Sequence, residues 1–215
     1  MTDPSPPSGR LDAPRLRSVL RPPPSGPGGR SGIGDAAPEG GRQAAVALVF
    51  APGTADTELL FIQRATAEGD PWSGQMALPG GRVDPGDPDT VHTAIRETAE
   101  EVGVDLDGAE RLGALADLEG GRITRRVTRV SAHAFWLPTP TPTSPNYEVA
   151  EALWVPMAHL LDRGRYIDYH HPAVDDAFPG IQLDNPEQVV WGLTLRLLAD
   201  LMARLGHPFL LRPDD

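Results

Sequence analysis

The stretch Leu78–Val104, LPGGRVDPGDPDTVHTAIRETAEEVGV, decides the fold of this chain. Its order of residues predicts a glycine turn, then an acidic loop, then a helix. Glu97, Glu100 and Glu101 are related by i, i+3 and i, i+4 steps, so they share one side of the helix within an arc of roughly 100°. Three carboxylates on one face repel each other unless a positive charge lies among them.

The opposite side of the predicted helix is apolar and is expected to be buried. It consists of Val91, Ala94, Ile95, Thr98 and Val102, which recur at helical spacing. The helix alone leaves open a simpler interpretation, in which the glutamates form a solvated acidic face. The turn at Gly80-Gly81 favours a site, because a helix behind a tight glycine turn brings main-chain oxygen close to the carboxylates.

This stretch resembles the Nudix box, whose pattern is G, five residues, E, seven residues, REUxEExGU, with U a bulky apolar residue. The matching residues are Gly81, Arg96, Glu97, Glu100, Glu101, Gly103 and Val104, with Thr98 at the first apolar position. Asp87 follows Gly81 at the five-residue gap but replaces Glu, and eight residues rather than seven separate it from Arg96. In the family this acid braces the arginine, a role that Asp87 or Asp89 could fill.

The resemblance implies an α/β fold, a Nudix-type α/β/α sandwich with a mixed β-sheet, over residues 43–208. Periodicity alone indicates only a mixed α/β domain. By the same resemblance, the metal ligands are Glu97, Glu100, Glu101 and the Gly80 carbonyl, and Arg96 orients Glu97. The catalytic set is then Arg96 with the three glutamates.

The implied chemistry is hydrolysis of a pyrophosphate. It requires neutralised phosphoryl oxygens and a nucleophile made from water, and a hard divalent cation supplies both. Mg²⁺ or Mn²⁺ with carboxylate ligands fits this requirement. The general base is left open between a box glutamate and an acid from a later loop, with Glu148 and Glu151 as the later candidates.

A second, narrower resemblance is to Nudix enzymes that cleave coenzyme A, which carry a segment like LLxxRS…GQxAFPGG before the box. The matching residues are Leu59, Leu60, Arg64, Gly74, Gln75, Ala77, Pro79, Gly80 and Gly81, whereas Leu78 replaces the phenylalanine. The run VWGLT at residues 190–194 resembles the WGxT entry to the last helix of that group.

These matches imply a nucleotide substrate, with Arg64, Gln75, Gly80 and Gly81 as substrate-binding residues. The favoured substrate is coenzyme A or an acyl derivative, cleaved to 3′,5′-ADP and a phosphopantetheine product. One alternative is a pyrophosphatase of ADP-ribose or dinucleoside polyphosphates, and another is a non-catalytic Nudix-fold binding module. Arg64 could equally cap a strand end in solvent.

Composition limits the other possibilities. The chain has 215 residues, a net charge of −11 and no cysteine, which argues against a nucleic-acid-coating protein and excludes disulfides and thiolate sites. It has no apolar run of membrane-spanning length and no secretion-signal core at its N-terminus. A cytoplasmic protein that does not bind membranes is expected, and a homodimer is possible.

Along the chain, residues 1–42 are rich in Pro, Gly, Ser and Arg, which predicts a mobile tail, although Leu16–Leu20 could form a short helical turn that docks on the domain. Strands are expected at 44–50, 57–64, 111–118, 126–137 and 151–156, a short helix at 157–161, and an amphipathic helix at 186–205. The segment 163–179 shows no clear period, so it is interpreted as a packed irregular loop or a substrate-pocket wall. Residues 209–215 are expected to form a C-terminal tail.

Overall fold

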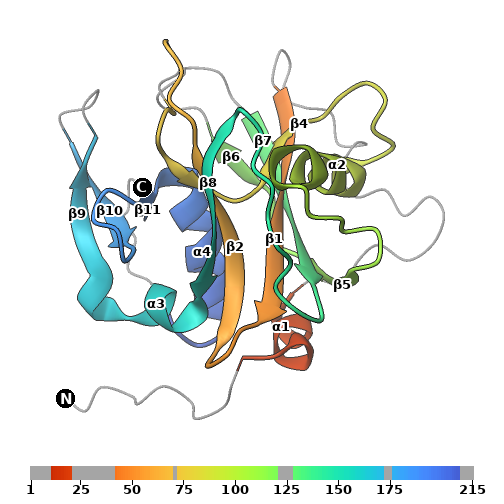
Figure 1. Cartoon of the computed structure of the whole chain (residues 1–215). Helices are drawn as coiled ribbons and strands as arrows, with labels where there is room; N and C mark the ends of the chain where they lie inside the picture. The colour runs from red at the N-terminus through yellow and green to blue at the C-terminus, as the bar shows by residue number, and fades with distance from the viewer. Residues whose placement is uncertain (1–10, 21–41, 70–71, 121–127, 172–175, 209–215) are drawn as a thin grey trace.

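The structure, a computed structural model, describes residues 11–20, 42–69, 72–120, 128–171 and 176–208 (Figure 1). The C-terminal tail predicted at residues 209–215 lies outside these described residues. Within the described ranges, no helix has both the length and the apolar character that crossing a bilayer requires.

An eight-stranded mixed sheet forms the centre of the molecule. Its main path runs β3 (Met76–Ala77), β2 (Thr57–Arg64), β1 (Arg42–Pro52), β7 (Thr128–Trp136) and β5 (Glu110–Ala114). Off this path, β4 (Gly80–Arg82) pairs with β1, β6 (Leu118–Gly120) with β7, and β8 (Val149–Pro156) with β2. The β1–β7 pair is parallel and the other pairs are antiparallel, so the predicted mixed sheet is confirmed.

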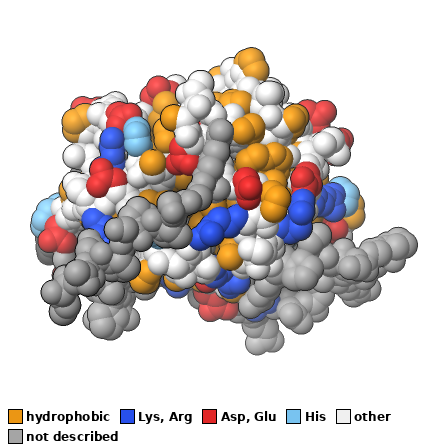
Figure 2. Space-filling view, turned by 90° about the horizontal axis from the view of Figure 1, so that it is seen from below, with side chains coloured by type: hydrophobic (Ala, Val, Ile, Leu, Met, Phe, Trp, Pro, Cys, Tyr) orange, Lys and Arg blue, Asp and Glu red, His pale blue; other side chains and the backbone are white. Residues whose placement is uncertain are grey.

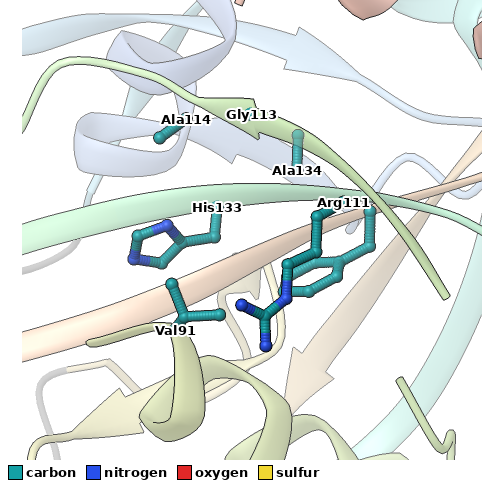
Figure 3. Close-up of a pocket in the computed structure, with 7 residues that line it drawn as sticks. Val91, Arg111, Gly113, Ala114, His133 and Ala134 are labelled. Atoms are coloured by element: carbon teal, nitrogen blue, oxygen red, sulfur yellow. The ribbon is translucent and has the colours of Figure 1, made fainter. Parts of the chain in front are cut away.

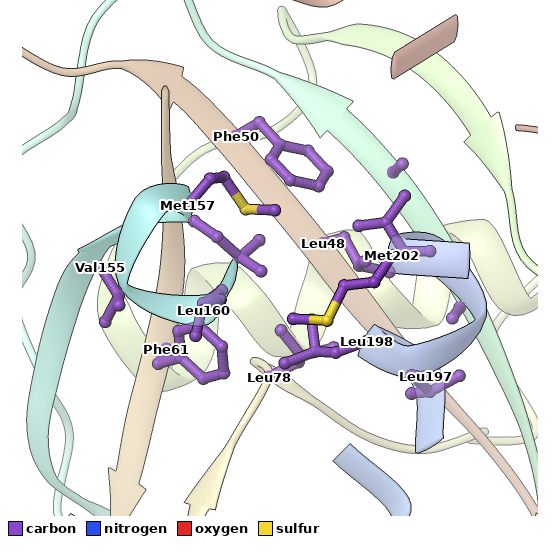
Figure 4. Close-up of a cluster of buried hydrophobic side chains, with 14 of the residues drawn as sticks. Leu48, Phe50, Phe61, Leu78, Val155, Met157, Leu160, Leu197, Leu198 and Met202 are labelled. Carbon is purple, nitrogen blue, oxygen red and sulfur yellow. The ribbon is translucent and has the colours of Figure 1, made fainter. Parts of the chain in front are cut away.

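Helices cover both faces of this sheet (Figure 1). One face packs on α2 (Thr90–Val102), through the cluster Ala45, Ala47, Val49, Leu60, Ile62, Val91, Ala94 and Val102. The other face packs on α3 (Met157–Leu161) and α4 (Gly192–Arg204), through a larger cluster that includes Leu48, Phe50, Phe61, Leu160 and Leu198 (Figure 4). Because side chains alternate along a strand, neighbouring residues of β1 and β2 enter opposite clusters. The predicted α/β/α sandwich is therefore confirmed.

Part of the segment expected to be a tail is folded. Helix α1 (Ala13–Val19) begins at Asp12, whose carboxylate accepts a hydrogen bond of 2.9 Å from the Arg15 N–H. Leu16 is fully buried and Leu11 and Leu20 are nearly so, all in the larger cluster. The docked helical turn suggested at Leu16–Leu20 is thus present within a longer helix, whereas the Pro- and Gly-rich composition alone predicts a tail over this segment.

Figure 2 views the molecule from below, the end at which α1 lies in Figure 1. Arginine and acidic side chains are intermixed with apolar ones on the described part of this face. The α1 backbone is tied to the domain at its C-terminal end, where the Arg204 Nη1–H donates to the Val19 carbonyl at 3.2 Å.

The segment expected to be irregular contains strands. After a 3₁₀ turn, η1 (Arg163–Arg165), β9 (Tyr166–His170) and β10 (Ala177–Gln182) form a separate antiparallel sheet with β11 (Val189–Trp191). The long helix predicted at 186–205 is correspondingly shorter, since α4 begins only at Gly192 after β11. Gly192 has φ 59°, a left-handed conformation that allows the change from strand to helix.

Candidate functional site

Helix α2 places the box side chains. Its N-terminus is capped by Asp89, whose carboxylate accepts a hydrogen bond of 2.9 Å from the His92 N–H, and Gly103 ends it with φ 68°. Both residues are suited to these positions, because an Asp oxygen satisfies a free N–H and Gly adopts the left-handed conformation without strain. The predicted apolar stripe is buried against the sheet, and this sets the rotation of the helix.

The three glutamates differ sharply in environment. Glu101 is 3% exposed, Glu97 is half-buried and Glu100 is exposed. The Glu101 Oε2 accepts a hydrogen bond of 2.9 Å from the Gly80 N–H. Burial, together with the negative charges of Glu97 and Glu148, raises the pKa of Glu101 to about 7, although the Gly80 N–H and Arg64 oppose this rise.

Glu97 lies against the glycine turn. A Cβ on Gly81 would overlap the Glu97 carboxylate, including Oε2 at 2.6 Å, so only glycine leaves room for it. Gly80 is equally constrained, because it has φ 151° and a Cβ there would meet the backbone of Val46 at 2.6 Å. The glycine turn and the carboxylates therefore meet, as the sequence predicts.

Arg96 connects the acids. Its Nη1–H donates to Glu97 Oε1 at 3.1 Å and to Glu100 Oε2 at 3.0 Å. Its other edge contacts Asp87, with Nε at 3.0 Å from Oδ1 and Nη2 at 2.9 Å from Oδ2. These Arg96 hydrogen bonds hold the pKa of the Asp87 carboxyl well below its usual range. Burial raises the pKa of Glu97, and Arg96 opposes that rise.

The donor set suits a divalent cation. Glu97 and Glu101 present carboxylate oxygens, and their mutual repulsion in a largely buried position is what a bound positive charge would relieve. In the described residues, however, no three His, Asp or Glu side chains lie close enough together to hold one metal ion. Arg96 donates to both Glu97 and Glu100, and Glu101 accepts from the Gly80 N–H.

The predicted substrate-binding residues Arg64 and Gln75 come together at the end of β2. The Arg64 N–H donates to the Gln75 carbonyl at 3.0 Å, and the Gly74 N–H donates to the Arg64 carbonyl at 3.1 Å. The positive charge of Arg64, at the end of β2, lowers the pKa of Glu101. The Arg64 guanidinium therefore acts on this box carboxylate.

The two later acids lie in different surroundings: Glu151 is in β8, and Glu148 is in the turn just before that strand. Glu151 pairs with Gln63, which follows Ile62 of the α2-side cluster and therefore points to the opposite face. There Glu151 Oε2 accepts a hydrogen bond of 2.8 Å from the buried Gln188 side chain. Glu148, by contrast, acts electrostatically on Glu101. The geometry thus separates two candidates that the sequence could not distinguish.

Sequence analysis missed the anchoring of the Glu148 loop. The Asn146 N–H donates to the Glu101 main-chain carbonyl at 2.9 Å, and the Asn146 Oδ1 accepts from the Glu148 N–H at 2.8 Å. An Asn two residues before an acid is a local signal for such a turn, but nothing in the sequence says that the turn lies at the end of α2.

A small recess lies beside the N-terminal part of α2 (Figure 3). It is lined by Val91, Arg111, Gly113, Ala114, His133, Ala134 and Phe135. It has room for about one water molecule. None of the box glutamates lines it, so this recess is separate from the box carboxylates.

Comparison with known proteins identifies the family of this chain. The NUDIX domain family matches residues 41–175. The chain is 39% identical over 115 residues to an uncharacterized protein of Schizosaccharomyces pombe, covering 51% of this chain and 35% of that protein. It is 33% identical over 139 residues to an uncharacterized Nudix hydrolase, NudL, of Yersinia pestis, covering 62% of this chain and 66% of NudL. The matches thus span less than two thirds of either relative.

Solved structures are more distant. The NUDIX domain of Shewanella oneidensis NrtR, complexed with ADP ribose, is 21% identical with a TM-score of 0.48, covering 60% of this chain and 83% of that one. A C. elegans Ap4A hydrolase binary complex is 20% identical with a TM-score of 0.47, covering 56% and 83%. The family match over residues 41–175, on a chain whose box residues meet at a glycine turn, shows that this protein belongs to the Nudix family.

Proposed function

We propose that this chain is a metal-dependent Nudix pyrophosphohydrolase, which cleaves a nucleoside diphosphate linked to another moiety. The observation that carries the proposal is the position of Glu101. Its carboxylate is 3% exposed beside the Gly80 N–H, near the negative charges of Glu97 and Glu148. A buried acid among like charges is costly for the fold, and it is expected where a cation and a phosphate are to be bound.

The proposed metal ligands are Glu97, Glu101 and the Gly80 carbonyl, with Glu100 contributing to a second ion, and Nudix hydrolases generally use divalent metal ions. When bound, Mg²⁺ or Mn²⁺ would neutralise phosphoryl oxygens and lower the pKa of its water. The Arg96 guanidinium, fixed by Asp87, orients the Glu97 carboxylate and compensates Glu100.

Two further residues complete the proposed site. Arg64, whose charge reaches Glu101, would contact the substrate phosphates. Glu148 would accept the proton from the attacking water as general base, because it is the later acid on the side of Glu101. A base within hydrogen-bond reach of the nucleophile contributes about 10²- to 10⁴-fold in rate.

The favoured substrate is coenzyme A or acyl-coenzyme A, giving 3′,5′-ADP and an (acyl-)phosphopantetheine product. Its support is the resemblance of the segment before the box, whose Arg64, Gly74 and Gln75 are joined by backbone hydrogen bonds at the end of β2. ADP-ribose or a dinucleoside polyphosphate is the alternative substrate class.

The test is a substrate panel of coenzyme A, ADP-ribose, NADH and diadenosine polyphosphates with Mg²⁺ and Mn²⁺, analysed by product identity. We expect cleavage of one class that chelation abolishes. Glu101→Gln should eliminate turnover while the protein stays folded, because it removes charge at nearly constant volume. The matched control, Glu187→Gln, changes an exposed acid outside the site and should retain turnover. Activity that survives chelation would contradict the metal assignment, and ligand binding without cleavage would favour a binding module.

A further inference from the structure

The loop between β7 and β8 is fastened to the end of α2. The Ser144 N–H donates to the Val102 carbonyl at 2.7 Å, and the Asn146 N–H donates to the Glu101 carbonyl at 2.9 Å. Asn146 then closes the turn through its own carbonyl, which accepts from the Val149 N–H at 3.3 Å. The backbone on both sides of Tyr147 is therefore held at the helix that carries the box carboxylates.

Tyr147 stands out in this loop because its ring has no packing role. It is 86% exposed, and it is the one large apolar side chain that is exposed within the described residues. Its hydroxyl is hydrogen-bonded to the carboxylate of Glu148, the acid whose charge acts on Glu101. The backbone of Tyr147 is thus held at the end of α2, its hydroxyl lies beside Glu148, and its ring is open to solvent.

We propose that the ring of Tyr147 is the surface on which the base of the substrate nucleoside stacks. This inference rests on the proposed function, since it assigns a subsite within the same site. An aromatic ring held in place loses little conformational freedom on binding, and base–aromatic stacking tolerates any base because every base has a π-face. Tyr147 would then provide affinity for nucleotides in general, and the phosphate contacts would lie with Arg64 and the metal.

A second group of aromatic side chains is less suited to this role. Tyr169, His171 and Phe178 surround Trp191 on the small sheet, with ring centroids 5.0, 5.0 and 5.2 Å from it. Trp191 is 5% exposed, and the other three are half-buried. These three rings already pack against Trp191, whereas Tyr147 contacts no ring within the described part of the chain.

The experiment measures binding of ADP and of inorganic pyrophosphate to the full-length chain by calorimetry with Mg²⁺ present, since neither ligand is a nucleoside diphosphate linked to another moiety. Wild type is compared with Tyr147→Leu, Tyr147→Phe and Tyr169→Leu. We expect Tyr147→Leu to weaken ADP binding by about tenfold, the effect of losing one base stack, and to leave pyrophosphate binding unchanged. Tyr147→Phe retains the ring and should bind ADP with near wild-type affinity. Tyr169→Leu, the matched control on the small sheet, should do the same.

The inference would be overturned by equal ADP affinity in wild type and Tyr147→Leu, or by equal losses for ADP and pyrophosphate. It would also be overturned if Tyr169→Leu weakened ADP binding and Tyr147→Leu did not, or if the wild-type chain bound no ADP. Failure of the proposed function is distinguishable from these outcomes. A chain that cleaves nothing in the substrate panel but binds ADP through Tyr147 would lose the hydrolase assignment and keep the base-stacking subsite.

Discussion

Arg96 and Asp87 form a two-pronged ion pair, with Nε 3.0 Å from Oδ1 and Nη2 2.9 Å from Oδ2. The loop before α2 is one residue longer than the Nudix pattern, and its acid is the shorter Asp. The pair nevertheless forms, because the Asp87 carboxylate also accepts hydrogen bonds from the Asp84 N–H at 2.9 Å and the Thr93 hydroxyl at 2.8 Å. The longer loop folds back far enough to offset the shorter side chain.

Replacing Asp87 with Asn should lower both stability and turnover. The depressed pKa of Asp87 means that its stabilisation is present above its usual pKa and is lost as pH falls through the lower, folded-state pKa. Asp87→Asn should therefore lower the free energy of unfolding at pH 7 by about 1–3 kcal/mol, as measured by urea titration. The loss relative to wild type should shrink in strong acid.

Asp84→Asn is the matched control for that prediction. The Asp84 side chain is 67% exposed and lies 3.9 Å from Arg96, so its removal should cost no more than about 0.5 kcal/mol. Equal losses in the two variants would show that Arg96 is not held specifically by Asp87.

A methyl group at Gly81 should disturb the site more than the fold. In Gly81→Ala the new Cβ overlaps the end of the Glu97 side chain, which can rotate away and leave its position against the turn. We expect turnover to fall at least about tenfold while the melting temperature changes little. Gly86→Ala, where a Cβ meets nothing within 4 Å, should retain activity. Wild-type turnover in Gly81→Ala would mean that Glu97 does not act from its observed position.

Glu148 and Glu151 should respond differently to conversion to Gln. Glu148→Gln removes the proposed base, so kcat should fall at least about 100-fold. Glu151→Gln changes an acid that points away from the α2 side of the sheet, where its partner is Gln188, so kcat should stay near wild type. Steady-state kinetics on the substrate identified by the panel would decide, and the reverse order of effects would assign the general base to Glu151.

His133 should make the fold sensitive to mild acid. Burial lowers the pKa of His133 (Figure 3) to about 4, and its Nε2 lies 2.9 Å from the Thr90 hydroxyl. The unfolded chain therefore binds a proton that the folded chain does not, and stability is lost as pH falls from 6.5 toward 4. The free energy of unfolding should drop by about 2 kcal/mol more in wild type than in His133→Gln between pH 7 and 4.5.

Exposed His170 provides the control for this pH dependence. His170→Gln should follow the wild-type stability curve across the same pH range in urea titrations. If His133→Gln and wild type lost stability in parallel, another group would be responsible for the acid sensitivity.

Truncating Leu16 should destabilise the whole domain. It is fully buried in the larger cluster, so Leu16→Ala should lower the free energy of unfolding by about 2–5 kcal/mol. Arg17→Ala removes an exposed ion pair with Glu110 and should cost at most about 1 kcal/mol. An unchanged free energy of unfolding in Leu16→Ala would show that α1 does not stay packed on the domain in solution.

The features that could be predicted from sequence are those with a local cause. Helix α2 follows from an apolar stripe of helical period between a capping Asp89 and a left-handed Gly103, all within one short stretch. Strands β1, β2, β7 and β8 follow from short apolar runs, and the box spacing identifies the family. Each of these signals depends on neighbours in the chain, so the sequence by itself determined four strands of the central sheet, the box helix and its position behind the glycine turn.

Only the tertiary structure decided which of several equivalent residues takes each role. Local spacing cannot tell that Glu101 is buried and Glu100 exposed, because this depends on the rotation at which α2 packs on the sheet. Strand pairing turns Glu151 away from the α2 side, whereas the turn that carries Glu148 is anchored to the end of α2. Leu16 enters the core only because distant segments leave space for it. These outcomes arise from contacts between residues that lie far apart in the chain. The free energy of each contact depends on burial and on nearby charges, and no short stretch of sequence contains that information.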